Sequence, residues 1–105
     1  MTKITAIGQK WGKKLTVEVT RERKGEKIKI LFNGKEEPCL VGELETAILM
    51  APYMANCYTP PKDSMLAYYN ALSNSFYEKV ESVDVKGRIE QIPTHRPKKG
   101  EIILY

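Results

Sequence analysis

The residues in this chain that are best suited to catalysis are few and widely separated. The single histidine, His95, stands beside Arg96 and Pro97, where a solvated loop residue is the usual interpretation and a general base the alternative. The cysteines, Cys39 and Cys57, could act as nucleophiles only if a base and an oxyanion site converged on them. Neither lies in a nucleophile motif. The sequence therefore predicts no catalytic residues and no enzymatic activity.

Metal and phosphate sites also lack their usual spacing. Neither cysteine has a second ligand at the short separation that zinc sites use. We expect both thiols to be reduced and mostly buried, although the sequence leaves a bridge between them open. Gly8 and Gly12 fall in a connection between strands rather than ahead of a helix, so they do not form a phosphate-binding loop. No metal and no cofactor are implied.

The first candidate binding surface is a basic segment around the only tryptophan, Trp11. The ring stands among three ammonium groups, those of Lys10, Lys13 and Lys14. Stacking on an aromatic ring with flanking cations is how single-stranded nucleic acid is commonly bound. A second basic loop, with Arg96, Lys98 and Lys99, would join this surface if the strand ends meet. The alternative, which we favour from the sequence, is that Trp11 is buried, as a sole tryptophan usually is.

The second candidate surface is a predicted helical layer rich in tyrosine and methionine, residues that are favoured at protein interfaces. Tyr69 fits the apolar stripe of its helix, whereas Tyr68 and Tyr77 lie off the stripe and should be partly exposed. Acidic residues surround the layer. The predicted contact residues are Tyr53, Tyr58, Tyr68, Tyr77, Glu78 and Glu81. Ordinary core packing of the tyrosines is the alternative.

A β-hairpin is the clearest element that could position these surfaces. Strict alternation predicts a strand over 15–20, and a second strand over 27–32 follows a turn at Lys24-Gly25. The expected register pairs Glu22 with Lys27 and Thr20 with Lys29 on a polar face, and Val19 with Ile30 and Val17 with Phe32 on an apolar face. A slip of one residue would invert every side chain.

Two helices are predicted after this hairpin. The first starts near Gly42-Glu43, with Glu43 and Glu45 in its first turn, and is broken or kinked at Pro52. The second follows Thr59-Pro60-Pro61, with Thr59 as its cap, and runs to about Val80. Its apolar stripe comprises Met65, Leu66, Tyr69, Leu72, Phe76 and Val80.

Further strands are predicted at both ends of the chain. They cover residues 2–7, a stretch that begins near Val83 and continues to Ile92, and residues 102–105, with a connecting loop over 8–14. The order β-β-β-α-α-β-β argues against alternating parallel units. We expect one α+β domain over residues 1–105, with a mostly antiparallel sheet of about five strands and two helices covering one face.

Composition limits the class of protein. The chain has 105 residues, of which 29% are charged and 42% hydrophobic, as in globular domains. Its net charge of +4 combines +7 over residues 1–35, −6 over 36–84 and +3 over 85–105, which predicts an electrostatically bipolar molecule. No signal peptide is recognisable, and the longest apolar run, residues 47–51, is too short to span a membrane. We expect a cytoplasmic protein without a membrane partner.

These features predict a binding protein that acts stoichiometrically on a macromolecule, most simply another protein, as an inhibitor or adaptor. Short chains without motifs are typical of the accessory proteins of phages and mobile elements. Two alternatives stay open. The basic segment around Trp11 could bind nucleic acid, or the tyrosine surface could be self-complementary and form a homo-oligomer.

Overall fold

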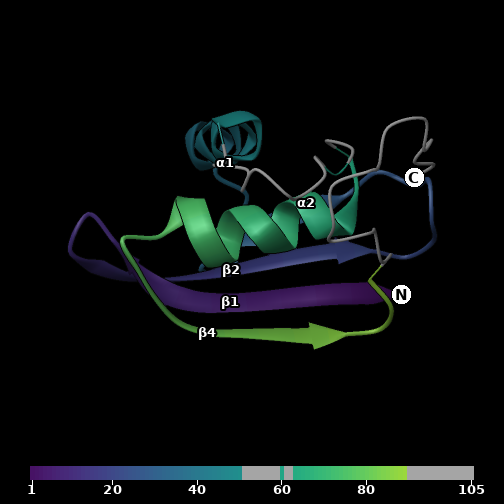
Figure 1. The fold of residues 1–105 in the computed structure, drawn as a ribbon, viewed down its shortest axis with the longest axis horizontal. Coiled ribbons are helices and arrows are strands. Elements are labelled where there is room, and N and C mark those ends of the chain that lie inside the picture. Colours follow the sequence, from purple (N-terminus) through teal and green to yellow (C-terminus); the bar gives the residue numbers. More distant parts are fainter. Residues whose placement is uncertain (51–59, 61–62, 90–105) are drawn as a thin grey trace, which may run out of the picture.

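Two successive hairpins form three adjacent strands of the sheet, and the last described strand is added beside the first. The computed structural model describes residues 1–50, 60 and 63–89. The strands are β1 (Thr2–Lys10), β2 (Lys13–Arg21), β3 (Lys29–Phe32) and β4 (Lys79–Lys86). All neighbours are antiparallel, in the order β3-β2-β1-β4. Figure 1 shows β2, β1 and β4 side by side.

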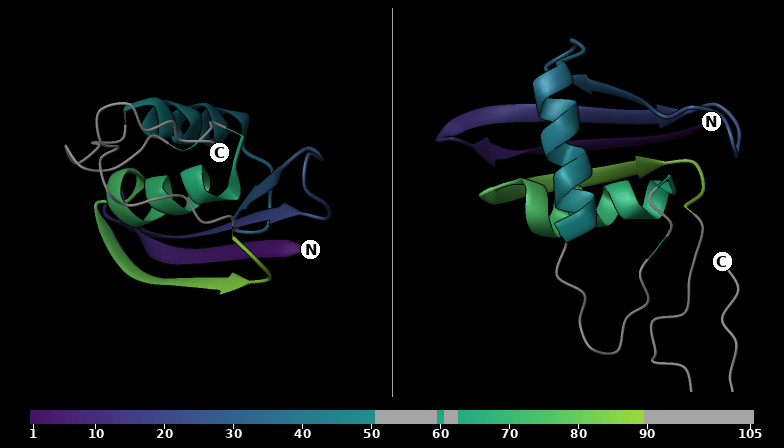
Figure 2. Two further views of the ribbon diagram at one scale, coloured as in Figure 1. Left: turned by 45° about the vertical axis from the view of Figure 1, so that its right-hand side comes forward. Right: turned by 90° about the horizontal axis from the view of Figure 1, so that it is seen from above.

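The helices lie on one face of this sheet. Helix α1 (Pro38–Met50) is followed by α2 (Met65–Asn70), which continues directly into a π-helix, η1 (Ala71–Phe76). The α2–η1 segment runs along the strands, and α1 crosses over it at a steep angle (Figure 2). The expected arrangement of two helical segments on one face of an antiparallel sheet is therefore confirmed.

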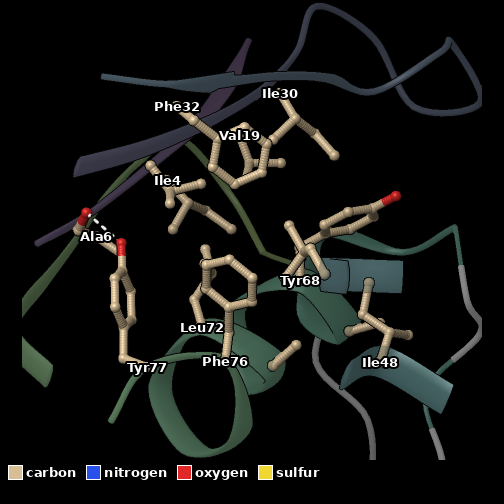
Figure 3. Close-up of a cluster of buried hydrophobic side chains, with 14 of the residues drawn as sticks. Ile4, Ala6, Val19, Ile30, Phe32, Ile48, Tyr68, Leu72, Phe76 and Tyr77 are labelled. Atoms are coloured by element: carbon tan, nitrogen blue, oxygen red, sulfur yellow. Dashed lines mark hydrogen bonds between the residues drawn. The ribbon is translucent and has the colours of Figure 1, made fainter. Parts of the chain in front are cut away.

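The core lies between the sheet and the helices. Alternate residues of β1 and β2, such as Ile4 and Val17, are fully buried because the period of a strand sends them to the helical side. Phe76 and Phe32 meet across the layers with ring centroids 6.1 Å apart (Figure 3). Burial of each such side chain stabilises the fold by roughly 1.5–3 kcal/mol.

The predicted register of the β2–β3 hairpin is confirmed over the whole ladder. The observed pairs are Val17 with Phe32, Glu18 with Leu31, Val19 with Ile30 and Thr20 with Lys29. The ladder ends there, so the expected pairing of Glu22 with Lys27 falls outside β3. The backbone N–H of Glu26 donates to the carbonyl of Arg23 at 3.0 Å, which closes the turn around Gly25.

The predicted loop over residues 8–14 is wrong. The strands continue through this segment, and β1 and β2 are joined by Trp11 and Gly12 alone. Both turn residues have positive φ, 54° and 73°, the geometry that matches a two-residue turn to the twist of its strands. Gly8 suggested a loop, but it lies within β1, where a Cβ atom would meet the ring of Tyr77.

The predicted helix boundaries also need correction. Helix α1 begins at Pro38, where the fixed φ of proline suits a first turn, so Glu43 and Glu45 lie within the helix rather than in its first turn. Helix α2 begins at Met65 instead of following Thr59. Its cap is Ser64, whose Oγ accepts from the N–H of Ala67 at 3.2 Å.

The second helical segment ends at Phe76, and Val80 belongs to β4 rather than to the helix. β4 therefore starts four residues before the predicted Val83. The strand stops at Lys86, because the next residue, Gly87, has a φ of 91°. Gly87 also lies so close to the main chain of Met1 that a Cβ atom would clash there. The described residues form four strands, not about five, and the strand expected over 102–105 lies outside the described residues.

Candidate functional site

The side chain of Trp11 is exposed at the tip of the β1–β2 hairpin. Its exposed fraction is 64%, so the expectation of a buried tryptophan is wrong. The residue is in the two-residue turn between β1 and β2, whereas Phe76 and Tyr77 are the buried aromatic residues near this end of the sheet. The tip lies at the end of the sheet opposite the N-terminus (Figure 1).

Two hydrogen bonds that involve Glu78 hold the tip in place. The N–H of Trp11 donates to Oε1 of Glu78 at 2.6 Å, and the N–H of Glu78 donates to the carbonyl of Gln9 at 3.0 Å. This exchange fastens the turn to the segment that leads from η1 into β4. The indole is therefore presented from a supported turn.

Lys10 lies behind the indole and is used inside the protein. Its Nζ donates to the carbonyl of Phe76 at 2.7 Å and forms an ion pair with Glu43 at 2.5 Å. The same ammonium lies 4.3 Å from the centroid of the Phe76 ring and 5.2 Å from that of Trp11. Only 10% of the side chain is exposed. Lys10, predicted as a direct contact for nucleic acid, instead braces the indole through a cation–π contact.

Exposed cations continue from the tip onto the outer face of the sheet, the side away from the helices. Lys13 and Lys14 follow the turn directly and are both exposed. The register places five lysines on the outer face, namely Lys3, Lys14, Lys29, Lys79 and Lys86. Two acids share that face, Glu18 and Asp84, and Glu18 pairs with Lys3 at 3.6 Å. The outer face is therefore basic.

The helical layer carries the opposite charge. Over residues 38–50 and 63–76 its charged residues are Glu43, Glu45 and Asp63, with no lysine or arginine. The bipolar distribution expected from the sequence thus separates onto the two sides of the described fold. Any anionic partner would meet the outer face of the sheet more favourably than the helices.

The backbone of Trp11 is strained. A φ of 54° is uncommon for a residue with a Cβ atom, and a large aromatic side chain there is an outlier. Asparagine, aspartate or glycine would suit this turn position better. Such strain, of order 1–3 kcal/mol, concentrates at functional positions. Trp11 is therefore a candidate functional residue.

Tyr77 is a core residue, so the expectation that it is exposed is wrong. Its backbone is extended beyond η1, and its ring packs over Gly8. The hydroxyl donates to the carbonyl of Ala6 at 2.9 Å and lies 3.4 Å from that of Leu15 (Figure 3). Burial raises the pKa of Tyr77 strongly, although a backbone hydrogen bond opposes the shift. The ring is unavailable as a protein contact.

Tyr68 is also mostly buried, with 8% exposed, whereas Tyr69, expected in the core stripe, is only partly buried. The predicted stripe was right at Met65, Leu72 and Phe76, but it included Leu66 and Tyr69 where the buried face has Tyr68. Tyr68 and Tyr77 thus lose the exposure on which their predicted partner contacts rested. Burial raises the pKa of Tyr68, and the nearby carboxylates of Glu45 and Asp63 raise it further.

The other predicted site residues are placed as follows. Glu78 and Glu81 are exposed, Glu78 at the turn contact and Glu81 on β4 where its register with β1 shifts. Cys39, expected to be buried, is exposed, because it is the second residue of α1. Outside the described residues lie Tyr53, Tyr58, Cys57, His95, Arg96, Lys98 and Lys99.

Sequence reasoning missed the support of the tip by Glu43 and Glu78. Both contacts join residues far apart in the chain, and no local pattern signals them. Among residues 1–50, 60 and 63–89 no group of three histidine, cysteine or acidic side chains is placed to hold a metal ion. Within the same residues no helix has the length and apolar character needed to cross a membrane. Comparison of the chain with models of known families, with curated proteins and with solved structures finds no match.

Proposed function

We propose that this protein is a non-enzymatic module that binds single-stranded nucleic acid through the tip of the β1–β2 hairpin and the outer face of the sheet. The observation that carries the proposal is the exposed indole of Trp11, held at a strained turn beside Lys13 and Lys14. Every base offers a π-face, so one exposed ring binds without sequence preference.

Lys10 lies over one side of the Trp11 indole, so a base would stack on the other side. The ammonium of Lys10 approaches the Trp11 ring and is itself fixed by Glu43 and Phe76. A ring that is already oriented loses less conformational freedom when a base stacks on it. Lys10 therefore contributes to affinity by orienting the ring, without touching the nucleic acid.

The outer face would carry the phosphates. Lys14 and Lys79 lie next to the tip, and Lys29 and Lys86 lie farther along the face. If about three of these lysines contact phosphates, the logarithm of affinity should fall with the logarithm of salt with a slope of about −2. The cytoplasmic location expected from the sequence is compatible with such a partner.

The hypothesis of a protein partner at the tyrosine surface is weaker in this fold. Tyr68 and Tyr77 are buried, and the remaining predicted tyrosines lie outside the described residues. A protein partner at the Trp11 tip, or a homo-oligomer, becomes the better hypothesis if nucleic acid has no effect on this residue.

The test uses Trp11 itself, which is the only tryptophan and so the only indole reporter. The intact chain is titrated with a single-stranded oligonucleotide of about ten nucleotides, at salt between about 50 and 200 mM. We expect quenching of the indole at low salt and steep weakening as salt rises. Fluorescence that ignores the oligonucleotide at the lowest salt would contradict the proposal.

Matched variants locate the interface by polarisation of a labelled oligonucleotide. Trp11→Ala should weaken binding about tenfold, which is the loss of affinity expected when one base can no longer stack on an aromatic ring. Leu49→Ala removes another exposed apolar side chain, 54% exposed on α1, and should have no effect. Lys14→Gln should reduce the salt slope by about 0.7. Lys27→Gln, in the connection at the other end of β2, should leave it unchanged.

A further inference from the structure

A pocket lies between α1 and the start of α2, away from the Trp11 tip. Its volume is about 360 Å³, within the range of small-ligand sites. It is lined by Glu45, Ile48, Leu49, Asp63 and Tyr68. The guanidinium of Arg21, the last residue of β2, donates to the main-chain carbonyl of Asp63 at 3.2 Å. The pocket is thus anchored to the end of the sheet opposite the hairpin tip.

Tyr68 supplies a polar group to this pocket. The residue is 92% buried, being 8% exposed, but its hydroxyl points away from the cluster around Phe76 and Leu72 (Figure 3). The structure gives this hydroxyl no hydrogen bond to a described residue. Because burial and nearby negative charge raise its pKa, the phenol stays protonated at neutral pH. A phenol oxygen can accept a hydrogen bond from a ligand while its proton is donated elsewhere.

Two carboxylates line the pocket together with Tyr68. Glu45 lies on α1, Asp63 precedes α2, and both act electrostatically on Tyr68. Neither carboxylate forms an ion pair with a described residue. Ile48 and Leu49 complete the lining with aliphatic surface. The pocket therefore combines negative charge, an unused hydroxyl and an apolar wall.

We infer that this pocket binds a protonated primary amine carried on an aliphatic chain, with the ammonium between Glu45, Asp63 and the Tyr68 hydroxyl and the methylenes against Ile48 and Leu49. An ammonium has three donors and no acceptor, which matches two carboxylates and a phenol oxygen. The inference does not depend on the proposed binding of nucleic acid, which uses the opposite end of the sheet.

The ligand chemistry has two sources, a lysine side chain of a protein and a free small amine. Three probes separate them: n-butylammonium, Nα-acetyl-lysine amide and the uncharged Nα-acetyl-norleucine amide. Binding is followed on the full chain by NMR, from the methyl signals of Ile48 and Leu49 and the ring signals of Tyr68. Saturable shifts with the two ammonium probes and none with norleucine would support the inference.

The same titrations rank the sources. Tighter binding of the lysine amide than of butylammonium would assign the site to a protein partner, and the reverse order to a free amine. Equal shifts with norleucine amide would overturn the inference, because the pocket would then recognise only an aliphatic chain. Absence of shifts with all three probes would overturn it as well.

Variants of matched size test the polar groups. Glu45→Gln and Asp63→Asn should each weaken ammonium binding about tenfold, as expected for a charge-assisted hydrogen bond. Tyr68→Phe keeps the ring in the core and should weaken it about fivefold. Glu36→Gln, an exposed carboxylate before α1, is the control and should change nothing. Unchanged binding in both carboxylate variants, with folding verified by circular dichroism, would overturn the inference.

Discussion

The carboxylate of Glu78 accepts a hydrogen bond from the backbone N–H of Trp11 across 2.6 Å, although 67 positions separate the two residues. The contact fastens the hairpin turn to the start of β4. It also leaves a negative charge beside the proposed binding surface. Glu78 therefore opposes the attraction of an anionic partner while it orders the ring that would contact it.

Substitution of Glu78 separates these two effects. Glu78→Gln keeps an acceptor and removes the charge, so we expect almost unchanged stability and affinity for oligonucleotide raised by up to about threefold. Glu78→Ala removes the acceptor as well and should lower the free energy of unfolding by about 0.5–1 kcal/mol, since the contact is exposed. Urea denaturation and polarisation measure the two quantities. Equal stability of both variants would show that the contact does not order the turn.

Replacement of Trp11 by asparagine should stabilise the protein while impairing its function. Asparagine adopts the positive φ of this turn with little strain. The relief of backbone strain should stabilise the variant by about 1 kcal/mol. This gain should outweigh the loss of the cation–π contact with Lys10, which contributes about 0.5 kcal/mol at an exposed site. Thermal denaturation of Trp11→Asn should therefore give an equal or higher Tm, with oligonucleotide binding reduced about tenfold. A marked loss of stability would instead make the indole a structural element.

The elements that the sequence predicts well are those whose pattern is local. Val17 and Val19 alternate with polar residues, and a short turn fixes their partners, so the register of β2 and β3 follows from adjacent residues. The β1–β2 turn was missed because its first position holds Trp11, where asparagine or glycine would have signalled it.

The exposure of the aromatic residues depends on contacts that no local pattern contains. Tyr77 is buried only because Gly8, far away in sequence, leaves room for its ring. Tyr68 is buried because the apolar face of α2 runs from Met65 to Tyr68, whereas the predicted stripe continued from Met65 to Leu66 and Tyr69. The sequence predicted the exposed components of the candidate site, namely Trp11, Lys13 and Lys14. It did not predict the contacts by which Lys10 and Glu78 support Trp11.

Tyr77 should make stability fall at high pH. Its pKa is raised in the folded state above the ordinary value of about 10, because burial disfavours the phenolate. Below pH of about 10 the phenol is protonated in both states and this contribution is fully present. Above it the unfolded chain ionises first, so stability declines as pH rises toward the folded pKa. Denaturation at a series of alkaline pH values measures this decline.

Tyr77→Phe tests the same group in two ways. At neutral pH it removes the hydrogen bond to Ala6 and should lower the free energy of unfolding by about 1–2 kcal/mol. At alkaline pH its stability should decline less steeply than that of the original chain. Tyr69→Phe, at a half-buried ring, is the control. Parallel pH curves for Tyr77→Phe and the original chain would contradict the assignment.

Gly8 and Gly42 form a matched pair, because alanine should have opposite effects at the two positions. At Gly8 a Cβ atom would lie 2.5 Å from the carbonyl oxygen of Lys79 and 2.9 Å from the Tyr77 ring. The backbone cannot yield there without displacing β4, so Gly8→Ala should lower the free energy of unfolding by about 2–3 kcal/mol. Gly42 lies inside α1 with nothing within 4 Å, so Gly42→Ala should raise it by about 0.5–1 kcal/mol through helix propensity. Urea denaturation of the two variants measures both changes, and a Gly8→Ala protein as stable as the original would show that Tyr77 does not pack on β1 as described.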